Sequence, residues 1–193
     1  PNALVDRGSE QDPSTMEQIF LQRIVVAPTA LLTNGATYNA GTRELEVSVT
    51  TDFQSGITGD WRVGVILTED GVTGVAGYAQ SNAYSGGASG EMGGYELLAD
   101  PVPAAQMVYD HVGRSITPGF DGLLNSFPAS VSGGTSLSNC FSFTLPAGWD
   151  ETKMHIISFL RSPSGIMDNA AKETITSAIT NGYVPCLTGI TEG

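Results

Sequence analysis

The sequence is poor in basic residues and in charges altogether. Lys and Arg number 8 against 20 Asp and Glu, so the net charge at pH 7 is −12, and charged residues make up only 15% of the chain. A nucleic-acid-binding protein neutralises phosphates with Lys and Arg, so this balance argues against that class. No apolar run approaches the roughly 18 residues of a membrane span. With 40% hydrophobic residues the chain is not a disordered acidic tail either.

Cysteine and histidine are also scarce. The only cysteines are Cys140 and Cys186, and no CxxC motif exists, which excludes a zinc ribbon and a thioredoxin-type redox pair. In an exported protein the two cysteines can pair, and the closed loop would stabilise the fold by about 4 kcal/mol on the chain-entropy model. In the cytosol both would be buried thiols. Two histidines argue against a His-rich catalytic zinc site.

Glycine, by contrast, is abundant, with 24 residues, and ten of them lie in two long stretches at 71–94 and 130–139. These stretches predict long loops between strands. Leu45, Val47 and Val49 alternate with polar residues, which is the period of a half-buried strand. Further strands are expected at 61–68, 107–116, 120–124, 141–145 and 154–160. Short strands separated by turn signals predict a mainly β fold, an antiparallel immunoglobulin-like β-sandwich over 28–193. Residues 169–179 fit either a helix or a strand. A strand is favoured, because the sandwich needs a final edge strand.

The first 27 residues have a different pattern and predict a short strand followed by a helix. Residues 2–6 form a short, largely apolar segment, and Ser14 and Glu17 have the spacing of a capping box that would start the helix. Apolar side chains then follow at helical spacing, at Met16, Ile19, Phe20 and Ile24. The chain begins with Pro1 and shows no charged and then apolar leader, so any export signal is expected upstream.

The densest polar cluster lies at 109–114 and allows two interpretations. Asp110 and His111 could be a base and its orienting partner, with Arg114 binding an anion. On a strand, however, Asp110 and His111 point to opposite faces, while Arg114 shares the face of Asp110. We favour a structural strand with an ordinary ion pair. Tyr78, Tyr84 and Tyr95 lie in or beside the Gly-rich loop, where side chains often contact partners.

The many carboxylates raise the question of calcium, the one cofactor that the composition would suit. Loop carboxylates and carbonyls bind calcium in exported proteins. No spaced D-x-D-x-D loop of an EF-hand is present. The favoured interpretation is therefore a solvated acidic surface that keeps the protein soluble, with no metal ligand assigned.

Four motifs resemble one known family. They are Leu67-Thr68-Glu69-Asp70, Gln80-Ser81-Asn82-Ala83-Tyr84, the segment from Tyr109 to Arg114, and Trp149-Asp150 before an apolar strand. Together they resemble the C-terminal half of the Bacteroidetes outer-membrane-protein family typified by a twenty-eight-kilodalton antigen. The resemblance implies a thioredoxin-like domain followed by an immunoglobulin-like sandwich, with residues 1–27 as the tail of the former. It also implies export to the cell envelope. The long Gly-rich insert departs from the family, which supplies no catalytic residue to carry over.

Three functions follow as hypotheses. The first is a non-enzymatic, exported β-sandwich that binds a protein or surface ligand through the Gly-rich loop and the strand at 110–114. The second is an accessory domain for the thiol–disulfide chemistry of a thioredoxin-like half. The third is calcium-dependent adhesion, which predicts a melting temperature raised by calcium. Neither nucleic acid nor a membrane span within this chain is expected in any of the three.

Overall fold

The computed structural model describes residues 4–186 and 189–191, and the fold is mainly β. The chain divides into two compact units. Unit 1 contains the residues up to Thr68 and those from Gly113 onward, and unit 2 is Glu69–Val112. This division does not coincide with the sequence-based one into 1–27 and 28–193. No helix in the described part of the chain combines the length and the apolar character that a membrane crossing requires.

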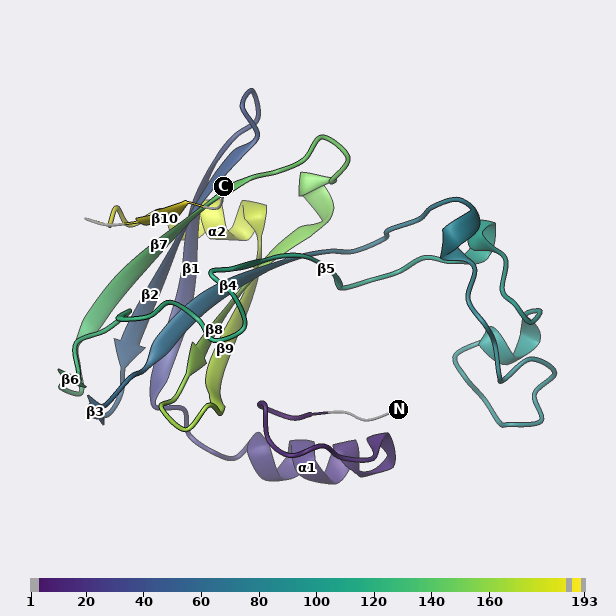
Figure 1. Ribbon diagram of the computed structural model, residues 1–193, viewed down its shortest axis with the longest axis horizontal. Helices are drawn as coiled ribbons and strands as arrows, with labels where there is room; N and C mark the ends of the chain where they lie inside the picture. Colours follow the sequence, from purple (N-terminus) through teal and green to yellow (C-terminus); the bar gives the residue numbers. More distant parts are fainter. Residues whose placement is uncertain (1–3, 187–188, 192–193) are drawn as a thin grey trace. The chain divides into compact units, whose positions relative to one another are not determined.

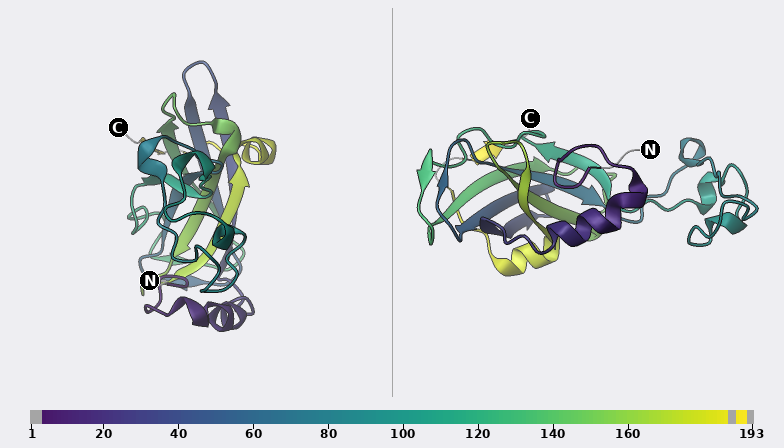
Figure 2. Two further views of the ribbon diagram at one scale, coloured as in Figure 1. Left: turned by 90° about the vertical axis from the view of Figure 1, so that its right-hand side faces the viewer. Right: turned by 90° about the horizontal axis from the view of Figure 1, so that it is seen from below.

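Unit 1 is a sandwich of two four-stranded sheets (Figures 1 and 2). One sheet has the order β1 (Ala30–Asn39), β2 (Glu44–Phe53), β7 (Ser136–Thr144), β10 (Gly189–Thr191). The other has the order β5 (Val112–Thr117), β4 (Arg62–Glu69), β8 (Met154–Arg161), β9 (Met167–Thr174). A short ribbon pairs β3 (Ile57–Thr58) with β6 (Ser130–Val131). Pairing is antiparallel between β1 and β2, β2 and β7, and β8 and β9, whereas β10 runs parallel to β7. The predicted antiparallel β-sandwich is confirmed.

The core lies between the two sheets. Leu45, Val47 and Val49 of β2 are fully buried, so the alternation predicted for this strand is confirmed. Both sheets supply the remaining apolar core, which includes Val63, Val65, Leu67, Phe141, Phe143, Ile156 and Leu160. Because β8 is bordered by β4 and β9, its near-continuous apolar sequence matches a central strand.

A polar residue in β1 joins the two sheets. Asn34 is fully buried, and its Nδ2 donates to the carbonyls of Ile156 at 3.3 Å and Ala171 at 3.1 Å. The amide of Asn181 in turn donates to the Asn34 carbonyl at 3.0 Å. These bonds satisfy the side-chain nitrogen and the backbone carbonyl of Asn34, which would otherwise be costly to bury. The buried Asn and Gly interrupt the apolar alternation, which is why β1 is not evident from the sequence pattern.

The C-terminal part of the chain corrects two sequence-based assignments. Residues 169–179 form neither a single strand nor a single helix, because β9 ends at Thr174 and helix α2 (Ile175–Asn181) begins directly after it. The Thr174 side chain accepts the N–H of Ser177 at 3.0 Å and so caps the helix. The stretch 130–139 is only partly loop, since it contains β6 and the first residues of β7. A disulfide joins Cys140 of β7 to Cys186 beyond α2.

The N-terminal segment forms its helix but not its strand. Residues 4–7 are turn and irregular backbone, with positive φ at Asp6 and Arg7, while residues 2 and 3 lie outside the described residues. Helix α1 (Met16–Arg23) follows a 3-10 turn, η1 (Pro13–Thr15). The predicted capping box between Ser14 and Glu17 does not form, because Asp12 Oδ1 accepts both the N–H and the hydroxyl of Ser14. No described side chain of α1 is buried, so its apolar stripe does not face the core.

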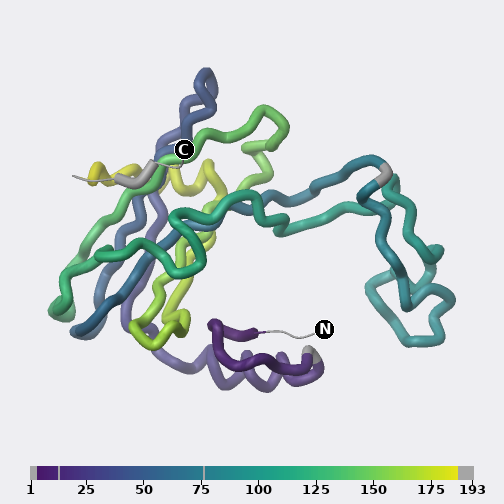
Figure 3. Tube along the Cα trace, in the orientation of Figure 1, coloured from purple at the N-terminus to yellow at the C-terminus, as the bar shows by residue number. Residues whose placement is uncertain are grey.

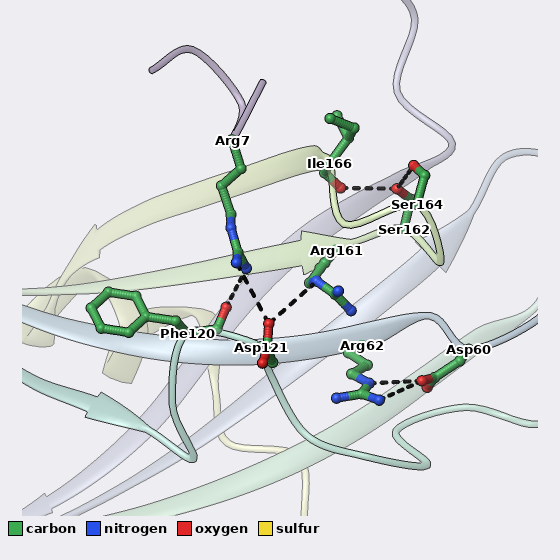
Figure 4. A network of polar contacts seen from close by, with 9 residues as sticks. All are labelled: Arg7, Asp60, Arg62, Phe120, Asp121, Arg161, Ser162, Ser164 and Ile166. Atoms are coloured by element: carbon green, nitrogen blue, oxygen red, sulfur yellow. Dashed lines mark hydrogen bonds and ion pairs between the residues drawn. The ribbon is translucent and has the colours of Figure 1, made fainter. Parts of the chain in front are cut away.

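A hydrogen bond and an ion pair from Arg7 connect this N-terminal segment to the sandwich (Figure 4). Arg7 donates to the Phe120 carbonyl at 2.6 Å and lies 3.5 Å from Asp121. The same carboxylate is 3.8 Å from Arg161 of β8. Residues 120–124 are turns and irregular backbone, so the strand predicted there does not form.

Candidate functional site

Unit 2 is built mainly from loops, and its trace winds through successive tight turns (Figure 3). It contains three 3-10 turns, η2 (Ala76–Tyr78), η3 (Tyr95–Leu97) and η4 (Ala104–Gln106). Two isolated antiparallel bridges cross it, Val72 to Tyr109 and Gln80 to Val102. All three tyrosines predicted to contact a partner fall within this unit.

The first and last residues of unit 2, 69–72 and 109–112, run side by side and are called the neck below. Asp110 and His111 of the predicted polar cluster form hydrogen bonds across it. Asp70 Oδ1 lies 2.8 Å from His111 Nδ1 and accepts the His111 backbone N–H at 2.7 Å. Asp110 Oδ1 accepts the N–H of Gly71 at 2.8 Å. His111 has a positive φ of 57°, a conformation that few non-glycine residues adopt. Asp110 and His111 therefore connect residues 109–112 to residues 69–72.

The structure corrects the strand geometry assumed for this cluster. Strand β5 begins only at Val112, so Asp110 and His111 precede it and do not alternate across a sheet. Arg114 lies within β5 in unit 1, where its guanidinium sits 5.7 Å from the centre of the Trp149 ring. That distance is typical of a cation–π contact. Asp110 and Arg114 thus belong to different units and share no strand face.

Asn82 organises the middle of unit 2. Its side chain is largely buried, and its Nδ2 donates to the carbonyl of Tyr95 at 2.7 Å and to that of Leu98 at 3.3 Å. Its Oδ1 accepts the N–H of Tyr84 at 3.2 Å, and its own N–H donates to Asp100 at 2.8 Å. One asparagine therefore positions the backbone at two of the three candidate tyrosines, a role that the sequence interpretation missed.

A carboxylate stabilises the turn before η3. Glu96 accepts the backbone N–H groups of Met92 at 2.8 Å and Gly94 at 3.0 Å. These hydrogen bonds, chiefly the one from Met92, hold the pKa of the Glu96 carboxyl below its ordinary value, because they favour the charged form. Glu96 therefore supports the loop at neutral pH.

The third candidate tyrosine lines a small apolar cavity. The rings of Tyr78 and Tyr109 meet edge to face with centroids 6.0 Å apart, and the Tyr109 hydroxyl donates to the Tyr78 carbonyl at 2.8 Å. Together with Val72, Gly77 and Val112 they line an open cavity of about 250 Å³. Tyr109 was not singled out from the sequence, although it opens the cluster at 109–114. The edge-to-face pair gives the cavity a stable aromatic wall.

Large apolar side chains of unit 2 are exposed to solvent. Val75 and Leu97 are each 83% exposed, and Val108 and Met92 about half. The unit also carries six carboxylates and neither Lys nor Arg; the acidic residues are Glu69, Asp70, Glu91, Glu96, Asp100 and Asp110. Unit 2 therefore exposes several large apolar side chains. Its charged side chains are all negative when His111 is neutral.

No metal centre is evident in residues 4–186 and 189–191, where no group of three or more His, Cys, Asp or Glu side chains is arranged to hold an ion. Comparison of the sequence with models of known protein families finds no match. A comparison with curated proteins finds none either.

Proposed function

We propose that this chain is an exported, non-enzymatic β-sandwich module that binds another protein through unit 2. The observation that carries the proposal is the set of exposed apolar side chains on unit 2, together with its tyrosine-lined cavity. The fold leaves Val75 and Leu97 largely uncovered, as their 83% exposure shows. Several large apolar side chains left exposed on one compact unit favour an interaction site over a surface that only faces solvent.

The composition of unit 2 supports a protein partner in particular. Tyr and Met are enriched at the centres of protein–protein interfaces, and Tyr78, Tyr95 and Met92 are all at least a third exposed. Unit 2 is also a loop-rich insertion between two strands of a well-packed sandwich. Binding residues are often found on loops that a rigid scaffold positions.

The disulfide supports export. Cys140 and Cys186 are bonded in the structure, and disulfides persist mainly in oxidising compartments. This agrees with the envelope location that the family resemblance implies. A non-enzymatic role is supported by the hydrogen bonds of Asp110 to Gly71 and of His111 to Asp70, which join two segments of unit 2.

Site-specific photo-crosslinking tests the proposal. The photoreactive residue p-benzoylphenylalanine would replace Leu97 in unit 2 or, as the matched control, Leu31 of β1, which is 49% exposed. Both variants would be irradiated in an envelope extract of the producing cell. We expect a discrete protein adduct from position 97 and none from position 31. The same adducts from both positions, or none from position 97, would refute a binding role for unit 2.

A further inference from the structure

We infer that the segment bound by unit 2 is a cationic polypeptide that presents Lys or Arg beside apolar side chains. This inference rests on the proposed binding role and specifies the chemistry of its partner. It is carried by two properties of the same unit, its apolar cavity and its one-sided charge.

The charge of unit 2 selects a positive partner. Six of the 20 acidic residues of the chain lie between Glu69 and Val112, and none of the eight basic residues does. Glu69 is buried, which leaves five carboxylate residues outside the buried set. A surface of one sign attracts ligands of the opposite sign and repels those of its own. Nucleic acids and anionic lipid surfaces are therefore disfavoured.

The cavity selects an apolar group within that partner. Val72, Gly77, Tyr78, Tyr109 and Val112 line it, and none of them carries a charge. An aliphatic side chain that enters the cavity loses contact with water, which favours binding. The faces of the tyrosine rings also attract a nearby ammonium or guanidinium group. A polypeptide with alternating basic and aliphatic residues offers both groups at once.

Synthetic peptides test this chemistry on the intact chain. Three fluorescent peptides of equal length would be compared by anisotropy: alternating Lys–Leu, alternating Glu–Leu and alternating Lys–Ser. We expect Lys–Leu to bind at least about tenfold more tightly than either of the others, because only it satisfies both the charge and the cavity. Raising NaCl from about 20 mM to about 500 mM should weaken its binding, because salt screens exposed charges.

Variants locate the binding. Tyr78→Ala removes an aromatic wall of the cavity and should weaken Lys–Leu binding several-fold, whereas Tyr78→Phe keeps the ring and should retain it. Leu97→Ser changes an exposed side chain without disturbing packing and should also weaken binding, while Leu31→Ser on β1 should not. Circular dichroism would establish that each variant is folded.

Equal binding of the Glu–Leu peptide, no binding of Lys–Leu, or unchanged binding in both Tyr78→Ala and Leu97→Ser would overturn the inference. Failure of the cationic-partner inference can be distinguished from failure of the binding role of unit 2. An adduct from position 97 in the crosslinking experiment, with no Lys–Leu binding, would retain the role and reject the cationic partner. Absence of that adduct would reject the role.

Discussion

Asp70 Oδ1 lies 2.8 Å from Nδ1 of His111, although 41 positions separate the two residues in the sequence. The same oxygen accepts the backbone N–H of His111 at 2.7 Å. One carboxylate thus joins the two arms of unit 2 where they leave β4 and approach β5. The contact brings the first and last residues of unit 2 together, so its loops begin and end next to each other.

Replacing Asp70 should loosen unit 2 and leave the sandwich intact. Asp70→Ala removes the acceptor for two hydrogen bonds, so amide exchange at 70–72 and 109–111 should become faster. Asp70→Asn is the matched control, because its Oδ1 can still accept the His111 N–H. Hydrogen–deuterium exchange with mass spectrometry would measure both. Unchanged exchange at the neck in Asp70→Ala would show that the contact does not hold the arms together.

Gly35 should tolerate no side chain. A Cβ at this position would lie 1.9 Å from the Gly182 carbonyl oxygen and 2.8 Å from Ser48 Oγ, so the segment after α2 would have to move away from β1. We expect Gly35→Ala to lower the free energy of unfolding by about 1–3 kcal/mol, the usual cost of overpacking, or more. Gly148→Ala, where a Cβ meets open space, is the control. Urea unfolding measures both, and equal stabilities would contradict the packing described.

The disulfide should contribute a large share of the stability. Cys140 and Cys186 are 46 positions apart, and a closed loop of that size stabilises a fold by about 4 kcal/mol on the chain-entropy model. The double variant Cys140→Ser/Cys186→Ser should unfold at a correspondingly lower urea concentration. Titration of the denatured, unreduced wild-type protein should detect no free thiol. Two titratable thiols would show that the bond does not form.

Acid should loosen the turn before η3. The pKa of Glu96 is held below its ordinary value of 4.5, so its contribution is complete above that pH and is lost as the pH falls through the lowered pKa. Exchange at Met92 and Gly94, corrected for the intrinsic pH dependence, should therefore stay level above the ordinary Glu pKa of 4.5 and rise only as the pH falls through the lowered pKa of Glu96. Glu96→Gln keeps an acceptor oxygen but does not titrate, so its corrected exchange should stay level. If corrected exchange at Met92 and Gly94 rises equally in the wild type and in Glu96→Gln, groups other than Glu96 cause the loosening.

The sandwich could be predicted from the sequence where burial imposes a simple period. Leu45, Val47 and Val49 alternate because one face of β2 is buried, and that alternation predicted the strand correctly. Strand β1 lacked this signal, because Asn34 and Gly35 occupy buried or closely packed positions that depend on partners far along the chain. The capping box failed because Asp12, two residues earlier, competes for Ser14.

The candidate site was only partly predictable for a related reason. The long Gly-rich loop and its tyrosines are visible in the composition, and the structure places Tyr78, Tyr84 and Tyr95 together in unit 2. The roles of Asp110, His111 and Asn82 depend on contacts between segments that no sequence period reveals. The accessory role beside a thioredoxin-like half and calcium-dependent adhesion stay predictions.

Hydrogen–deuterium exchange of the full chain, with and without the partner recovered by crosslinking, tests the central claim most directly. If unit 2 is the binding element, the partner should slow exchange within Glu69–Val112, above all around Val75–Tyr78 and Tyr95–Leu97, and leave the strands of the sandwich unchanged. Slowed exchange confined to the sandwich strands, with unit 2 unaffected, would contradict the proposed function.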